Sequence, residues 1–116
     1  MKKESRMTFD TCIINDVHVL TPRKNLVGGD ETTSLAVAVA ELAANGVPRV
    51  VVDLGKIEWV NSLGIEGLLK ARRTCVDRQG WFRLARVGQR IENILLITKL
   101  VLVFDTFETV EQAVSG

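Results

Sequence analysis

This chain of 116 residues has few of the residues that build common catalytic and metal sites. It contains one histidine, His18, and two cysteines, Cys12 and Cys75. The cysteines form no CxxC motif and no histidine cluster accompanies them, so the pattern is not that of a zinc site. We expect both cysteines to be small core residues, because free cysteine is among the most buried residue types. No metal and no cofactor are expected.

An excess of charge of one sign is also missing. The chain has 15 basic and 14 acidic residues and a net charge of +1, so nothing favours the phosphate backbone of a nucleic acid as a direct partner. We therefore expect the partner to be a protein or a small ligand.

Long hydrophobic runs are lacking as well. The alanine- and leucine-rich stretch 32–45 is too short to span a membrane, and Glu41 interrupts it. Lys2 and Lys3 are followed by polar residues rather than by the apolar stretch of a signal peptide. We expect no membrane span and a cytoplasmic protein.

Hydrophobic residues make up 47% of the chain and charged residues 25%, which is typical of one globular domain. We expect a single domain over 1–116, with its core at about 8–115. Apolar patterning predicts strands at 8–14, 17–20, 50–54, 81–87 and 100–104. It predicts helices at 32–45, 62–79, after Gly88, and at 105–115. This order favours an α/β fold in which about four helices pack against a single mixed sheet of four to five strands.

Local signals mark the ends of these elements. Asn15 and Asp16 are suited to a tight hairpin turn. Asp30 can cap the first helix. Two pairs in the last helix have capping-box spacing, namely Asp105 with Glu108 and Thr109 with Gln112. The inward face of the helix at 62–79 is expected to carry Ile65, Leu68, Leu69, Cys75 and Val76.

The segment 50–69 is the most informative part of the chain. It predicts a buried strand, a short loop, and a helix whose first turn carries Ser62. Free backbone N–H groups and the helix dipole favour a negative charge at such a position. A phosphate on Ser62 and a bound anion both fit this pattern.

Several features together resemble the STAS domain of bacterial anti-sigma factor antagonists: the strand 50–54, the Val60-Asn61-Ser62 loop end, Gly64, the Leu68-Leu69 pair, Gly80 and the segment 97–104. The resemblance implies a STAS-like fold and a partner-switching regulator with no enzymatic activity of its own. It implies phosphorylation of Ser62 by a serine kinase that is also an anti-sigma factor, and reversal by a PP2C-type phosphatase. The unmodified form would capture the kinase and release its target.

The chain departs from the family pattern near this serine. Asn61 stands where aspartate is usual, Leu63 where a small residue is usual, and Glu66 where glycine is frequent. Asn61 keeps the capping ability without the charge, whereas Glu66 opposes a phosphate one turn away. The expected partner-binding residues are Gly28, Gly29, Asp30, Asn61, Ser62, Leu63, Ile65 and Glu66.

Two other interpretations of Ser62 stay open. Ser62 can serve only as a helix cap. The domain can also be an unphosphorylated STAS scaffold subunit of a transporter or of a larger signalling complex. Trp59 and the alanine-rich helix could offer a dimer surface, although buried packing explains them better. We expect a monomer or a weak homodimer.

Enzymatic and nucleotide-binding alternatives are poorly supported. Asp53 at a strand end could be the phosphate-accepting aspartate of a response-regulator receiver. However, the acidic pair with which such receivers hold magnesium is incomplete in this chain. An esterase would need His18 as its base, and no G-x-S-x-G elbow surrounds Ser62. Gly28 and Gly29 lack the lysine of a phosphate-binding P-loop, so a turn explains them.

Overall fold

The computed structural model describes residues 9–116, and the expected strand residue Thr8 and the basic start of the chain lie outside this range. The elements are β1 (Phe9–Ile14), β2 (Val17–Pro22), α1 (Asp30–Ala44), β3 (Arg49–Asp53), α2 (Ser62–Asp77), β4 (Trp81–Ala85), α3 (Gln89–Ile97), the 3₁₀ helix η2 (Leu100–Leu102), β5 (Asp105–Phe107) and α4 (Val110–Ser115). The predicted order of strands and helices is therefore confirmed.

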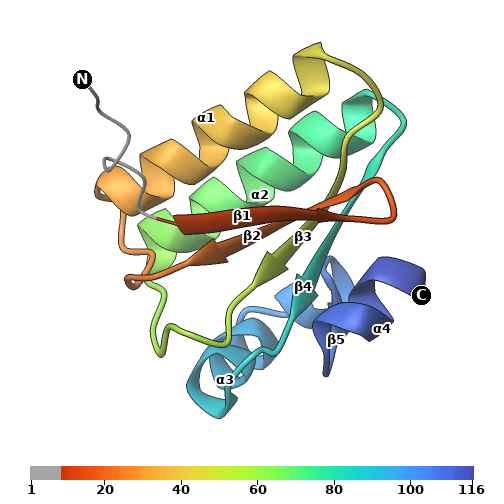
Figure 1. The fold of residues 1–116 in the computed structure, drawn as a ribbon. Helices are drawn as coiled ribbons and strands as arrows, with labels where there is room; N and C mark the ends of the chain where they lie inside the picture. Colours follow the sequence, from red (N-terminus) through yellow and green to blue (C-terminus); the bar gives the residue numbers. More distant parts are fainter. Residues whose placement is uncertain (1–8) are drawn as a thin grey trace.

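One five-stranded sheet forms the centre of the molecule, in the order β1-β2-β3-β4-β5 (Figure 1). β1 and β2 pair antiparallel, and the other neighbours pair parallel. The hairpin turn is Asn15-Asp16, and both residues have positive φ, as a two-residue hairpin requires. A mixed sheet with four α-helices confirms the expected fold class.

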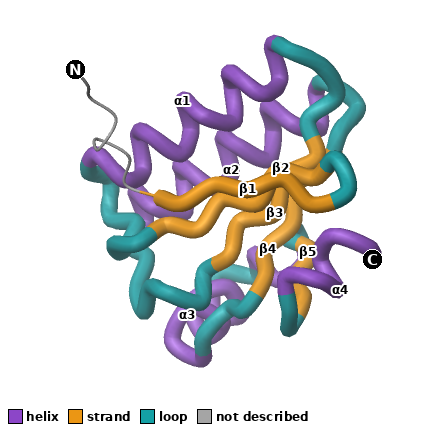
Figure 2. The backbone as a smooth tube through the Cα atoms, in the orientation of Figure 1, coloured by secondary structure: helices purple, strands orange, loops and turns teal. Residues whose placement is uncertain are grey.

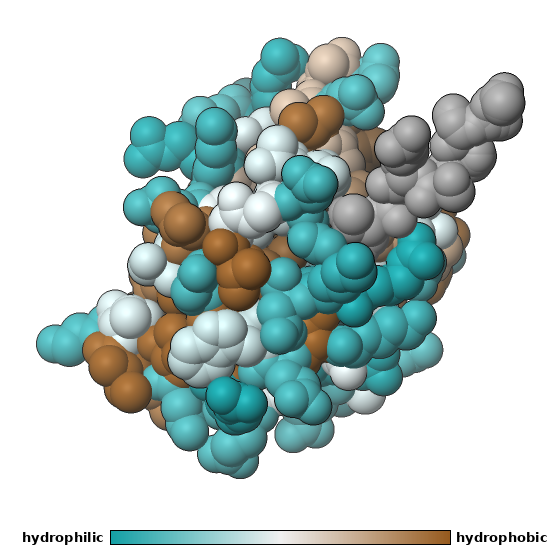
Figure 3. All heavy atoms as spheres, turned by 90° about the vertical axis from the view of Figure 1, so that its left-hand side faces the viewer, coloured by the Kyte–Doolittle hydropathy of each residue, from teal (hydrophilic) through white to brown (hydrophobic). Residues whose placement is uncertain are grey.

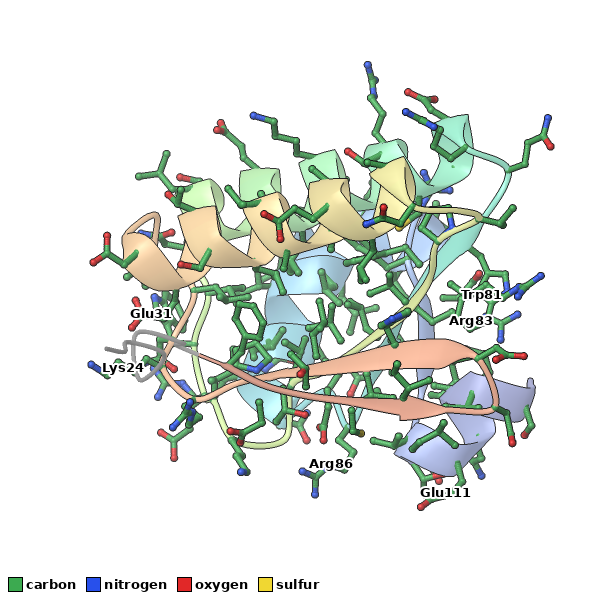
Figure 4. The ribbon with its side chains drawn as sticks, turned by 45° about the horizontal axis from the view of Figure 1, so that its top comes forward. Lys24, Glu31, Trp81, Arg83, Arg86 and Glu111 are labelled. Atoms are coloured by element: carbon green, nitrogen blue, oxygen red, sulfur yellow. The ribbon has the colours of Figure 1, made fainter. Side chains whose placement is uncertain are left out.

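The helices cover the two faces of the sheet unequally. α1 and α2 lie side by side over one face, and the short α4 lies against the other (Figures 1 and 2). The central strand β3 contributes Val50, Val51 and Val52, all fully buried, because both faces of the sheet are covered there. On the second face the Arg83 guanidinium lies 3.8 Å from the centre of the Trp81 ring and donates to the Ala113 carbonyl at 2.9 Å (Figure 4).

The C-terminal part differs from the prediction. The apolar stretch 100–104 is not a strand, because Lys99 adopts positive φ and the chain then forms η2. The last strand is instead Asp105–Phe107, which pairs with β4 through Arg83↔Asp105 and Ala85↔Phe107. The capping box expected at Asp105 and Glu108 is therefore absent. The second expected cap is confirmed, because Thr109 accepts a hydrogen bond from the Gln112 amide at 3.0 Å.

Several burial predictions are also corrected. Cys75 is buried, but Cys12 is exposed because β1 is an edge strand. Val76 is 47% exposed and Trp59 is 38% exposed, so neither is a core residue. Trp59 lies in the loop before α2, where the Arg90 guanidinium is 5.1 Å from its ring centre.

Candidate functional site

Ser62 is the first residue of α2, as its sequence context predicts. The fully buried Leu54 and Val60 anchor the two ends of the loop that leads from β3 to it. The Ser62 side chain is exposed, and its hydroxyl makes no hydrogen bond within residues 9–116. The hydroxyl is therefore accessible to solvent.

Asn61, and not Ser62, caps this helix. The Asn61 Oδ1 accepts a hydrogen bond from the Gly64 amide at 3.0 Å, and its carbonyl accepts one from Ile65 at 2.9 Å. The amides of Ser62 and Leu63 have no partner in the described part of the chain. Free amides at a helix N-terminus favour negative charge, so a phosphate on Ser62 would lie where main-chain dipoles stabilise it. The interpretation of Ser62 as a mere cap is wrong.

The loop before α1 is held against the start of α2. The Asn61 side-chain amide donates to the Val27 carbonyl at 3.2 Å, and the Asn61 main-chain amide donates to the Leu26 carbonyl at 3.2 Å. Leu26 is fully buried and pairs with Val60 as a parallel bridge. A side chain at Gly64 would collide with the Leu26 carbonyl, so glycine there permits the close approach.

Gly28 shapes the other side of this contact. Its φ is +94°, and a Cβ at this position would lie 2.7 Å from the Leu63 Cβ. The Gly28 amide donates to the Thr32 hydroxyl at 2.9 Å. Gly29 is the N-cap of α1, and Asp30 is the first helical residue, so the expectation that Asp30 caps this helix is corrected. The interpretation of Gly28 as a turn residue is confirmed.

The surface around Ser62 combines apolar and acidic side chains. Leu63 is 52% exposed and Val27 is 41% exposed. Figure 3 shows hydrophobic side chains among polar ones on the side of the molecule where α2 begins. Glu66 is exposed one turn after Ser62, whereas Ile65 is only 8% exposed. Ile65 therefore lies beneath the surface, and the expectation that it contacts a partner directly is corrected.

A groove of about 400 Å³ extends this surface between α1 and α2. Small residues allow the two helices to pack closely, since a Cβ at Gly67 would lie 2.5 Å from the Thr32 methyl carbon. The exposed side chains of Leu63 and Val37 line the groove, with Glu66 and Lys70 beside them. The groove can receive an apolar side chain of a docked protein.

Three residues that support the site were not identified from the sequence. The Asn25 Oδ1 accepts hydrogen bonds from the amides of Glu58 and Trp59, at 3.0 and 3.1 Å. Leu26 and Thr32 supply the carbonyl and hydroxyl described above. The partners of Asn25 and Leu26 lie 33 to 35 positions away along the chain, so no local spacing could have found these two. Thr32 bonds Gly28 only four positions away, but a threonine in the first turn of a helix gives no specific signal of this contact.

Asp53 has a structural task. Its carboxylate oxygens accept hydrogen bonds from the Arg86 guanidinium at 2.9 and 3.1 Å and from the Gly55 amide at 2.9 Å. The pairing raises the pKa of Arg86, first through this hydrogen bond and then through the charge of Asp53. The Asp53 side chain is 8% exposed while Arg86 reaches solvent (Figure 4). Asp53 therefore fixes the loop after β3, as a strand-end residue would, and does not present a free acceptor carboxylate.

Residues 9–116 contain no group of histidine, cysteine and acidic side chains arranged to hold a metal ion. Within the same range, every helix is too short or too polar to cross a bilayer.

Comparison with known proteins identifies the class. Residues 9–113 match the model of the STAS domain, and the chain belongs to this family. A Thermotoga neapolitana protein, described as a candidate anti-sigma factor antagonist, is 23% identical over 105 residues that cover 90% of this chain and 93% of that protein.

Solved structures share the fold. The crystal structure of a Thermotoga maritima protein with the same description has a TM-score of 0.84 at 20% identity, covering 92% of each chain. The unphosphorylated form of the anti-sigma factor antagonist SpoIIAA has a TM-score of 0.70 at 13% identity, covering 92% of this chain and 94% of that one. The chain is thus a STAS protein that resembles anti-sigma factor antagonists.

Proposed function

We propose that this protein is a partner-switching regulator controlled by phosphorylation of Ser62. Its unmodified form binds an anti-sigma factor that is also a serine kinase, and it has no enzymatic activity of its own. Phosphorylation of Ser62 ends this binding, and a PP2C-type phosphatase restores it. The observation that carries the proposal is the exposed, unbonded hydroxyl of Ser62 at the start of α2, where Asn61 already caps the helix.

The docking surface consists of Gly28, Gly29, Asp30, Asn61, Ser62, Leu63 and Glu66, with Ile65 buried beneath it. Its apolar part, Leu63, supports binding of the unmodified form because burying a leucine side chain contributes about 1.5 to 3 kcal/mol. The groove between α1 and α2 continues this surface.

A phosphate changes the surface without changing the fold. It adds a charge of about −1.5 to −2, which would have to be desolvated when the partner docks. Each 1.4 kcal/mol of this cost lowers the affinity about tenfold. The helix start accepts the charge, since the Ser62 and Leu63 amides are free, while Glu66 opposes it by about 0.2 to 0.5 kcal/mol. The stabilisation of the phosphate by the free amides and the helix dipole is at least as large as the repulsion by Glu66, so the modified protein remains folded.

Binding to a purified anti-sigma factor kinase from the same genome tests the switch by isothermal titration calorimetry. We expect Ser62→Ala to bind like the wild type and Ser62→Asp to lose at least about tenfold in affinity. Ser115→Asp is the matched control, because Ser115 is exposed on α4 and receives the same charge away from the surface. Equal affinities for the two aspartate variants would contradict the proposal.

Phosphopeptide mass spectrometry on protein isolated from its native cells tests the modification itself. We expect phosphate on the peptide that contains Ser62, and its loss in Ser62→Ala cells. Phosphate confined to other residues would contradict the proposed switch, and a chain that is never modified would favour the scaffold alternative.

A further inference from the structure

The outer edge of β1 is a part of the surface separate from the Ser62 site. β1 is the first strand of the sheet and pairs only with β2 among the described residues (Figure 2). The strand β3, from which the chain runs to Ser62, lies two strands further in. A partner on the β1 edge therefore leaves Ser62 accessible.

The hairpin geometry determines which main-chain groups face outward. Ile14 and Val17 flank a two-residue turn, so they form a hydrogen-bonded pair. From there, hydrogen-bonded pairs alternate with non-hydrogen-bonded pairs along the strand. Phe9 faces Pro22 at the other end of the strand. Because proline has no N–H, this agrees with a pair that is not hydrogen-bonded. The N–H and C=O groups of Phe9, Thr11 and Ile13 therefore point away from β2 and have no partner in the described chain.

This edge lacks the features that usually prevent strand addition. β1 has no proline, no lysine and no bulge, since its register with β2 is continuous from Phe9 to Ile14. Its one charged residue, Asp10, is paired with Lys56 at 3.1 Å and Arg23 at 3.4 Å. The apolar Ile13 is 64% exposed on the strand. Among residues 9–116, nothing covers this edge, and its side chains do not repel another strand.

From this edge we infer that two copies of the chain associate through antiparallel pairing of their β1 strands, about a two-fold axis at Thr11. In this register Thr11 faces Thr11 of the second copy, and Phe9 faces Ile13. All three outward-facing residues then form hydrogen-bonded pairs, and Ile13, which is 64% exposed in the single chain, lies against the β1 strand of the second copy.

The competing register, centred on Cys12, fits less well. It places the Asp10 carboxylate opposite the apolar Ile14 and leaves the outward groups of Phe9 without partners in the described strand. Because a two-fold axis makes each contact twice, both defects would also occur twice. The Thr11 register is therefore the one that the edge favours.

Sedimentation velocity from low micromolar to near-millimolar concentration tests the association. We expect the wild type to shift from monomer to dimer, and Ile13→Lys to weaken the dimer at least about tenfold by placing charge on the edge. Ile97→Lys is the matched control, because Ile97 is 81% exposed on α3, away from β1. Circular dichroism and thermal melting confirm that both variants fold, as expected for exposed sites.

A wild type that stays monomeric at every concentration would overturn the inference, as would equal weakening by both lysine variants. The register is tested by disulfide formation under mild oxidation. With the Thr11 axis, Cys12→Ser/Thr11→Cys forms a covalent dimer because facing Cα atoms lie about 5.5 Å apart. Covalent dimers from the wild-type Cys12 alone, with none from this variant, would overturn the Thr11 register.

Discussion

The Asn61 side chain accepts a hydrogen bond from the Gly64 amide at 3.0 Å, and this contact leaves the neighbouring Ser62 hydroxyl unbonded. The same side chain donates to the Val27 carbonyl at 3.2 Å. Asn61 thus caps α2 and ties it to the loop before α1. An aspartate at this position would keep the cap but could not donate to Val27.

Stability measurements can separate the capping residue from its neighbour. We expect Asn61→Ala to lower the free energy of unfolding by about 0.5 to 2 kcal/mol, because the cap and the bond to Val27 are lost. Ser62→Ala removes no hydrogen bond of the described chain, so its effect should stay within about 0.5 kcal/mol. Urea unfolding of both variants checks this, and a larger loss for Ser62→Ala would assign the cap to the serine.

Gly64→Ala tests the close approach of α2 and the loop. Alanine is favoured over glycine within a helix by about 1 kcal/mol, but here its methyl group would meet the main-chain carbonyl of Leu26. We expect the collision to dominate and to lower stability by about 1 to 3 kcal/mol. Gly88→Ser is the control, because a Cβ at Gly88 meets no atom within 4 Å. A higher melting temperature for Gly64→Ala than for the wild type would show that the Leu26 main chain moves to accommodate the methyl group.

The Asp53–Arg86 pair can be tested by a double-mutant cycle. Arg86→Ala leaves the buried Asp53 carboxylate with the Gly55 amide alone, and we expect a loss of about 1.5 to 3 kcal/mol. Because Arg86 is partly exposed, water limits the loss to this range. The double variant Asp53→Asn/Arg86→Ala should lose less free energy of unfolding than Asp53→Asn and Arg86→Ala lose in sum. Additive losses in urea unfolding would mean that the two side chains do not interact.

Stability should fall in alkaline solution through Cys75. Burial raises the pKa of the Cys75 thiol to about 12. The folded state therefore holds this proton more tightly than the unfolded state. The resulting stability is fully present below the ordinary thiol pKa of about 8.5, and it is lost as the pH rises toward 12. We expect the decline above pH 8.5 to be steeper in the wild type than in Cys75→Ala.

The comparison is controlled, since both proteins retain the exposed Cys12 and differ only at the buried position. Urea unfolding at several pH values measures the slopes. Parallel slopes for the two proteins would show that the buried thiol does not contribute.

Local sequence features determined much of the fold and the place of the site. The paired left-handed residues Asn15 and Asp16 produced the hairpin, the valine run 50–52 produced the buried central strand, and the change of pattern at Ser62 marked the start of α2. Each of these signals lies within a few neighbouring residues, so turn chemistry and burial patterns could identify it.

Only the tertiary structure decided the remaining features. Pairing with β4 placed the last strand at Asp105–Phe107 rather than in the more apolar stretch before it, and the edge position of β1 exposed Cys12. Asn61 caps α2 through a local bond to Gly64, but its second bond, to the Val27 carbonyl, joins it to a loop 34 positions away. Contacts between residues so far apart depend on how the elements pack, and no local spacing in the chain encodes them.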